Sequence, residues 1–272
     1  MSAKHKNTAR QKGDRGRRRS RSPRSRRAKV SLARVLSKLG YCSRTQARDL
    51  IQAGRVQVNG TVQRAPSTRI DMRRDRISVD GQRIEAAAKV YLMLNKPRGL
   101  VTTACDDRGR ETVYRCLTDP ALPWVSPVGR LDKASEGLLL FTNDTRWAAR
   151  ILEPATHLEK TYHVQVDCVA GDRLLQALQA GIVDQGEILK TRDVRLLRHG
   201  TRNSWLEVVL DEGKNRHIRR MLQALDVGVL RLVRVAIGPL KLGELAKGEC
   251  RHLTEAERDA VRRAMQPQRK PE

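Results

Sequence analysis

Apolar residues near the start of the patterned chain recur at three- and four-residue intervals and then begin to alternate with polar ones. The helical spacing runs to Gly40 and is carried by Leu32, Val35, Leu36 and Leu39. A second helix is predicted after Ser43, because Ser43 and Gln46 have the spacing of a capping box. Alternating segments follow, and Asn59-Gly60 and Asp80-Gly81 are typical of hairpin turns. The pattern predicts a small α/β unit over residues 30–85, followed by a short linker at 86–88.

A longer region, residues 89–265, mixes strand-like apolar runs with helical patterns. Strands are predicted at 91–94, 138–141, 162–166, 206–210 and 230–235. Helices are predicted near 145–152, 172–180, 216–225 and 255–265. These elements follow no regular βαβ order and include no Gly-rich phosphate loop. The pattern therefore favours an α+β domain built around a mostly antiparallel sheet.

The two ends of the chain lack such patterning. Residues 1–29 contain 13 Lys or Arg against a single acid, Asp14, and include repeated Arg-Ser pairs. With almost nothing apolar, this segment cannot build a core and is predicted to be a disordered basic tail. It would act as an electrostatic arm for RNA phosphate or as a merely solvated extension. Residues 266–272 are predicted to be a short C-terminal tail.

Charge distinguishes this composition from that of an average globular protein. Lys and Arg number 55 against 30 Asp and Glu, so the formal net charge is +25, while 39% hydrophobic content is enough for a core. A field of this sign attracts polyanions, which favours nucleic acid as the partner. The aromatic content of 3% argues against broad base-stacking surfaces. Apolar runs such as 138–141 are too short to span a membrane.

Cysteine and histidine spacing argues against a metal site. The five cysteines include no C-x-x-C pair, and the six histidines include no H-x-x-x-H or H-E-x-x-H spacing. No G-x-S-x-G sequence suggests a serine hydrolase. The N-terminus is polar and resembles no secretory signal. We therefore expect a cytoplasmic protein without disulfides or bound metal.

The region predicted as the small α/β unit contains the string S-R-T-Q-A…I-Q-A-G-R-V-Q-V-N-G, residues 43–60. This string resembles the S4-type RNA-binding domain. The resemblance implies that basic helix faces contact structured RNA, at Arg34, Arg44, Arg48 and Arg55. Charge alone does not decide between that role and an ordinary solvated helix face.

The string G-R-L-D-K-A-S-E-G-L-L-L-F-T-N-D, residues 129–144, predicts a loop with Arg130, Asp132 and Glu136 before a strand that begins at Leu138. From the pattern alone, Asp132 is at least as compatible with a turn-capping role as with a catalytic one. The whole string resembles the signature of the RsuA/RluB/RluE/RluF family of ribosomal RNA pseudouridine synthases. That resemblance implies that Asp132 is the catalytic residue.

Further segments occur in the order of that family: N-K-P-R-G at 95–99, E-K-T-Y at 159–162 and E-G-K-N-R-H-I-R-R-M at 212–221. The resemblance implies that Tyr162 lies in the active site and that Ile218 forms an apolar floor for the base. It implies a cationic partner for the aspartate, with Arg219 as the first choice and Arg216 as the second. Arg216 could instead bind phosphate. Substrate-binding roles are expected for Lys96 and Arg130, and His217 stands where glutamine is more usual.

The implied reaction breaks the N-glycosidic bond of a flipped-out uridine and rejoins the uracil through carbon 5. It needs an ionised carboxylate but no redox change or hydrolysis, so no cofactor is expected. The predicted substrate is ribosomal RNA or a ribosomal assembly intermediate, with the large subunit favoured over the small, and the protein is expected to act as a monomer. A non-catalytic RNA-binding assembly factor is the main alternative. A glycoside hydrolase would usually need a second carboxylate, and Glu136 is the only nearby candidate.

Overall fold

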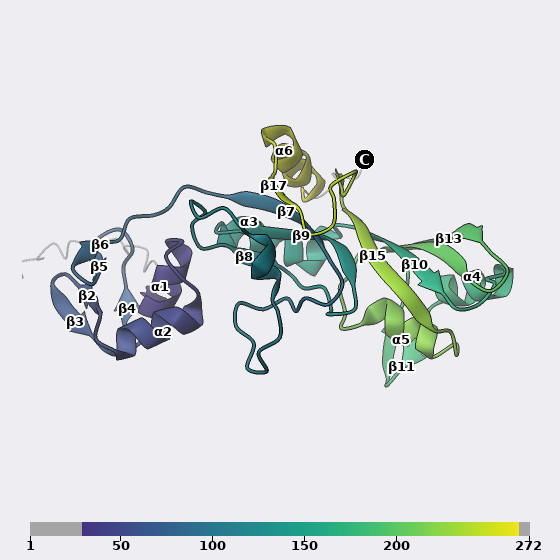
Figure 1. Ribbon diagram of the computed structural model, residues 1–272, viewed down its shortest axis with the longest axis horizontal. Coiled ribbons are helices and arrows are strands. Elements are labelled where there is room, and N and C mark those ends of the chain that lie inside the picture. Colours follow the sequence, from purple (N-terminus) through teal and green to yellow (C-terminus); the bar gives the residue numbers. More distant parts are fainter. Residues whose placement is uncertain (1–28, 267–272) are drawn as a thin grey trace, which may run out of the picture.

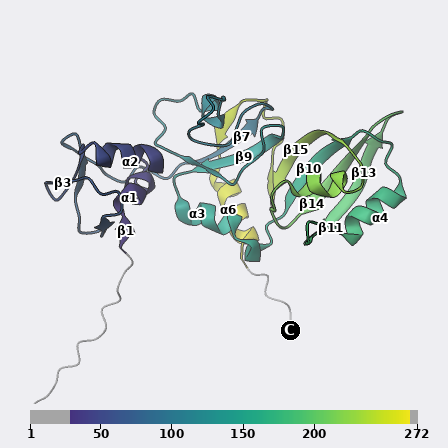
Figure 2. The same ribbon diagram turned by 90° about the horizontal axis from the view of Figure 1, so that it is seen from below.

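The computed structural model describes residues 29–266, which form a small N-terminal unit followed by a larger sheet-based domain (Figures 1 and 2). Apart from Lys29 and Gln266, the two predicted tails lie outside the described residues. Figure 1 shows the N-terminal unit at one end of an elongated arrangement and the β13 edge of the main sheet at the other. Within residues 29–266, no helix combines the length and apolar character needed to cross a bilayer.

The N-terminal unit has two helices packed on short strands. The helices are α1 (Leu32–Lys38) and α2 (Arg44–Gln52), and the predicted capping box is present, with Ser43 and Gln46 exchanging hydrogen bonds. The strands are β1 (Val30–Ser31), β2 (Val56–Val58), β3 (Thr61–Gln63), β4 (Arg69–Ile70), β5 (Ile77–Val79) and β6 (Gln82–Arg83). They pair as β3-β2-β5-β6 and β1-β4. Asn59 and Asp80 have positive φ at the two predicted turns.

The larger domain is built on one extended sheet. Among the described residues nine strands join it, in the order β13-β14-β10-β15-β9-β7-β17 with β16 and β8 beside that path. They are β7 (Tyr91–Lys96), β8 (Ser126–Val128), β9 (Glu136–Thr142), β10 (Lys160–Val166), β13 (Asp193–His199), β14 (Ser204–Leu210), β15 (Val229–Ile237), β16 (Leu240–Lys241) and β17 (Cys250–His252). All pairings are antiparallel except β9 with β15. The predicted α+β fold is therefore confirmed.

Helices cover the sheet where the apolar pattern predicted them. They are α3 (Thr145–Leu152), α4 (Asp172–Ala180), α5 (His217–Gln223) and α6 (Glu255–Ala264), with short 3₁₀ helices η1 (Val113–Cys116) and η2 (Pro154–Thr156). Leu178 of α4 and Met221 of α5 share one buried cluster with Val164 and Leu206 of the sheet. Both helices therefore pack on the same face of β10 and β14. The hairpin formed by β11 (Ile182–Asp184) and β12 (Glu187–Leu189) was not predicted from the sequence.

Backbone hydrogen bonds join the N-terminal unit to the larger domain. Trp124 donates its backbone N–H to the Gly40 carbonyl at 2.8 Å, and Ala87 donates to the Leu39 carbonyl at 2.9 Å. The end of α1 thus contacts both the predicted linker and the long segment between β7 and β8.

Candidate active site

Asp132 lies in the loop that leads into the central strand β9. This strand begins at Glu136, two residues before the predicted start, and pairs with β15 in parallel at Glu136 and Gly137. Gly137 has a φ of +100°, and a Cβ there would lie 2.3 Å from the Arg234 carbonyl oxygen. Only glycine allows the two backbones to approach this closely. The loop is therefore attached to a strand in the centre of the sheet.

The N-K-P-R-G segment, residues 95–99, supports the 129–135 loop through hydrogen bonds. The Lys96 Nζ donates to the carbonyl oxygens of Pro97 at 3.1 Å, Asp132 at 3.2 Å and Ser135 at 2.8 Å. The Gly99 N–H donates to the Lys133 carbonyl at 2.8 Å. Burial lowers the pKa of Lys96 to about 8. Because Lys96 is 0% exposed, the expectation that it contacts substrate is corrected: its ammonium supports the loop.

A cavity of about 270 Å³ opens beside Asp132. Its walls come from the 129–135 loop, from strands β10, β14 and β15, and from the 213–218 segment at the start of α5. They comprise Gly129, Arg130, Leu131, Asp132, Ser135, Tyr162, Leu210, Gly213, Lys214, Asn215, Arg216, His217, Ile218 and Leu232. The structure therefore brings together Asp132, Arg130, Tyr162, Arg216 and Ile218, which lie far apart in the sequence.

Of the two arginines, Arg216 is the one within ion-pair distance of the Asp132 carboxylate. Arg216 Nη1 lies 4.0 Å from Asp132 Oδ2, and both side chains are partly exposed. Arg219 donates from Nη2 to the Ala134 carbonyl at 3.2 Å, and it lines a neighbouring cavity. Arg216 thus lies within ion-pair distance of the carboxylate, while Arg219 contacts the backbone of the same loop and carries a charge that Asp132 also attracts. Arg219 is the third residue of α5, and its side chain reaches the backbone of the 129–135 loop.

Glu136 does not lie in the loop as predicted, and it is not available as a second catalytic carboxylate. Its side chain is buried and accepts hydrogen bonds from Arg231 Nη2 at 3.0 Å and Lys247 Nζ at 2.6 Å. Burial opposes its negative charge, but these two cations outweigh that effect and lower the pKa of Glu136. The cavity wall therefore carries one carboxylate, which argues against the two-carboxylate chemistry of a glycoside hydrolase.

Two buried polar side chains of the cavity wall were not assigned a role from the sequence. Ser135 Oγ and both ring nitrogens of His217 have no hydrogen-bond partner among the described residues. Burial lowers the pKa of His217, so the imidazole is neutral near pH 7. A buried polar group without a partner costs about 1–3 kcal/mol. Both residues lie inside the family motifs, at 129–144 and 212–221, and this position could have identified them as members of the site.

The basic residues of the N-terminal unit divide into two groups. Arg34, Arg44 and Arg48 line one concave surface between α1 and α2, together with Gln52 and Pro66. Arg55 lies elsewhere: its Nε donates to Asp80 Oδ1 at 2.9 Å beside the paired strands β2 and β5. The structure thus groups three of the four arginines that the S4 resemblance implied.

Comparison with known proteins agrees with this geometry. The model of the RNA pseudouridylate synthase family matches residues 90–224, and the S4 domain model matches residues 30–77. An uncharacterised RNA pseudouridine synthase of Aquifex aeolicus is 37% identical over 84% of this chain and 92% of its own. Ribosomal large subunit pseudouridine synthase B of Bacillus subtilis is 34% identical over 82% of this chain and 91% of its own.

A solved pseudouridylate synthase covers 85% of this chain and 99% of its own, with 30% identity and a TM-score of 0.60. The chain therefore belongs to the RNA pseudouridine synthase family, and an S4 domain precedes its catalytic region. The resemblance inferred from the sequence is confirmed. The protein is an isomerase that converts uridine in RNA to pseudouridine, so a purely non-catalytic role is set aside.

Proposed function

We propose that this protein converts a specific uridine of ribosomal RNA to pseudouridine, with Asp132 as the catalytic carboxylate. The observation that carries the proposal is the convergence of Asp132, Arg216, Tyr162 and Ile218 on one cavity. The Arg216 guanidinium lies 4.0 Å from this carboxylate, so the two opposite charges attract each other. The loop hydrogen bonds from Lys96 and Gly99 fix the position of this charge relative to the cavity.

In this mechanism the target uridine leaves its stack and enters the cavity. Ile218 supplies an apolar surface for the uracil, while the Tyr162 ring stacks on it or removes a proton after recombination. Asp132 approaches the ribose anomeric carbon and the ring as the N-glycosidic bond breaks, and the uracil then rejoins through carbon 5. Arg130 contacts the flanking phosphate or orients the loop. Flipping a base costs a few kcal/mol, and contacts between phosphate and basic side chains offset that cost.

The proposed substrate is the large-subunit ribosomal RNA, alone or in an assembly intermediate. Support comes from the name of the Bacillus subtilis relative and from the net charge of +25. In this proposal residues 30–85 bind structured RNA through Arg34, Arg44 and Arg48, and residues 89–265 carry out the reaction. The protein acts in the cytoplasm as a monomer and without a cofactor. Small-subunit ribosomal RNA is the alternative substrate.

Pseudouridine mapping of both ribosomal RNAs tests this proposal. Cells that lack the protein are expected to lose a pseudouridine in the large-subunit RNA. The wild-type protein restores it, whereas an Asp132→Asn variant present at the same level does not. Loss at a small-subunit position would select the alternative substrate. An unchanged map of both RNAs would contradict ribosomal RNA as the substrate.

A further inference from the structure

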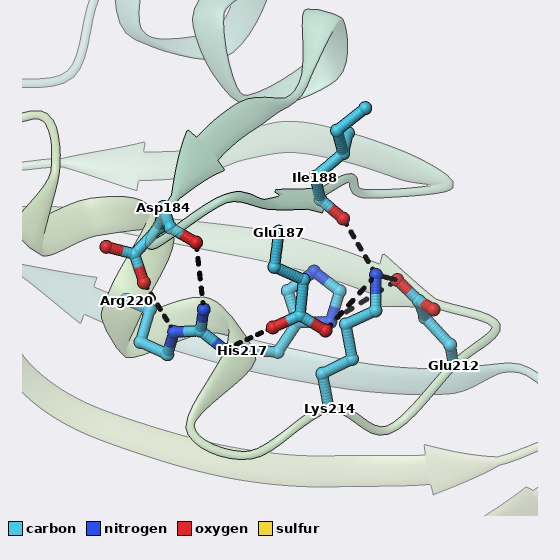
Figure 3. Close-up of polar contacts among 7 residues, drawn as sticks. All are labelled: Asp184, Glu187, Ile188, Glu212, Lys214, His217 and Arg220. Atoms are coloured by element: carbon cyan, nitrogen blue, oxygen red, sulfur yellow. Dashed lines mark hydrogen bonds and ion pairs between the residues drawn. The ribbon is translucent and has the colours of Figure 1, made fainter.

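The β11–β12 hairpin lies against the segment that carries Lys214 and Arg220, the residues on either side of Arg216 (Figure 3). A two-stranded hairpin alone is marginally stable in water. This one is anchored because Leu189 of β12 is fully buried in the cluster that includes Ile218 and Met221. The hairpin therefore has a fixed position relative to α5, and Asp184 and Glu187 present carboxylates to that helix.

Arg220 connects the hairpin to the C-terminal side of Arg216. Its Nε donates to Asp184 Oδ2 at 2.6 Å, and its Nη1 donates to Glu187 Oε2 at 2.8 Å (Figure 3). The Arg220 backbone N–H donates to the Arg216 carbonyl at 2.8 Å. A planar guanidinium that bridges two carboxylates has little freedom to rotate. The first turn of α5 is thus held at its exposed side.

Lys214 connects the hairpin to the N-terminal side of Arg216. Its Nζ donates to the Ile188 carbonyl at 2.7 Å and lies 2.9 Å from Glu212 Oε1 and 3.8 Å from Glu187 Oε1 (Figure 3). Glu187 therefore contacts both cations that flank Arg216. The group Asp184, Glu187, Lys214 and Arg220 is called the hairpin clamp below.

The backbone of Arg216 explains why a clamp is needed. Arg216 is left-handed, with φ 49° and ψ 30°, directly before the first residue of α5. For a residue with a Cβ this conformation costs roughly 1 kcal/mol or more, and it persists only where the surroundings impose it. In this conformation the guanidinium lies 4.0 Å from Asp132 Oδ2.

We propose that the acidic residues Asp184 and Glu187 are positioning residues for the reaction. Through Lys214 and Arg220 they hold the 212–220 segment so that Arg216 stays left-handed and its guanidinium stays beside Asp132. This inference rests on the proposed catalytic role of Asp132. The clamp residues themselves act on the arginine and not on the RNA.

The double substitution Asp184→Asn/Glu187→Gln removes both charges with little change in shape. Its kcat is expected to fall about tenfold, because a small displacement of a group at the reaction centre can cost that much. The KM for RNA is expected to stay within about twofold, since no phosphate contact is removed. The matched control is Asp259→Asn/Glu257→Gln, which breaks the ion pairs of these α6 carboxylates with Arg262 and Arg251 away from the cavity. The control should keep the wild-type kcat even if its melting temperature falls equally.

Combination with Arg216→Met makes the test specific. If the clamp acts through Arg216, adding the clamp substitutions to Arg216→Met lowers kcat no further. The inference is overturned if the clamp substitutions lower the kcat of Arg216→Met by the same factor as that of the wild type. It is also overturned if the clamp substitutions alone leave kcat unchanged, whether or not KM rises. Asp132→Asn separates a failure of the proposed function from a failure of this inference. Full turnover by Asp132→Asn contradicts the proposed function. If Asp132→Asn is inactive but Asp184→Asn/Glu187→Gln keeps the wild-type kcat, only the role of the hairpin clamp is contradicted.

Discussion

The segments that bring Asp132 and Arg216 together are held in different ways. The 129–135 loop is anchored from inside, by the buried Lys96 ammonium and by the contact of Gly137 with β15. The 212–220 segment is held from outside, by partly exposed ion pairs of Lys214 and Arg220 with the β11–β12 hairpin. Buried hydrogen bonds to a charge are stronger than exposed ion pairs. The aspartate is therefore the rigid half of the site and the arginine the adjustable half.

Gly137→Val should break the rigid half and produce the largest effect on stability. A Cβ placed 2.3 Å from a backbone carbonyl cannot be relieved by a side-chain rotation, so β9 or β15 must shift. The free energy of unfolding is expected to fall by about 3 kcal/mol or more, as in severe overpacking. Chemical denaturation measures this loss. Gly186→Val, at an open hairpin turn with a φ of +78°, controls for backbone strain without the clash.

Lys96→Met should disable the loop with less damage to the fold. Three carbonyl oxygens lose their donor, including that of Asp132 itself. We expect kcat to fall between about tenfold and a hundredfold, the range for a misplaced catalytic group, with RNA affinity nearly unchanged. Single-turnover kinetics and an RNA binding titration measure the two quantities. An equal loss of affinity would instead return Lys96 to the substrate-binding role expected from the sequence.

The buried Lys96 should also make the free energy of unfolding depend on pH in the alkaline range. Its pKa is about 8 in the folded protein against an ordinary value of 10.5, so the unfolded chain binds more protons between these values. The Lys96 contribution to the free energy of unfolding therefore rises with pH in this window, by at most about 1.4 kcal/mol per pH unit. The difference between wild type and Lys96→Met, followed from pH 7 to 10, isolates it. A pH-independent difference would contradict the lowered pKa of Lys96 in its buried position beneath the loop.

The smallest predicted effect is a loss of stability at acidic pH that is caused by His217. Burial lowers the pKa of His217, and its Nδ1 lies 3.9 Å from Glu212 Oε1 in the same segment as Lys214. The unfolded chain therefore takes up a proton on this imidazole more readily than the folded protein does. As a result, the free energy of unfolding decreases as pH falls below about 6.5, the ordinary pKa of histidine. His217→Gln removes a titrating group and should flatten this part of the profile. Thermal melts between pH 5 and 7 measure the difference, and parallel profiles would exclude His217 as its origin.

Much of the fold follows from short-range patterns. Helices α3 and α4 have the predicted bounds, because each shows a regular apolar face and a clear start. The β11–β12 hairpin was missed because its strands have three residues each, with Val183 and Ile188 exposed, so no alternating pattern is visible. Its position is decided by Leu189, whose burial depends on residues far away in the chain.

The site was predictable in its members but not in its pairings. Motif positions identified Asp132, Tyr162, Arg216 and Ile218, yet they did not tell whether Arg216 or Arg219 faces the carboxylate. That choice depends on the left-handed backbone at Arg216, which no local pattern in an Asn-Arg-His sequence predicts. Lys96 was misassigned for a related reason. A lysine within a family motif suggests substrate binding, and only the tertiary structure shows that its ammonium is enclosed by backbone carbonyls.

The central claim is that one carboxylate, Asp132, performs the reaction in this cavity. Its direct test is the single-turnover rate of pseudouridine formation by purified Asp132→Asn on ribosomal RNA, with RNA affinity measured on the same preparation. The predicted result is no detectable product with affinity equal to or slightly above that of the wild type. Turnover at the wild-type rate would contradict the claim.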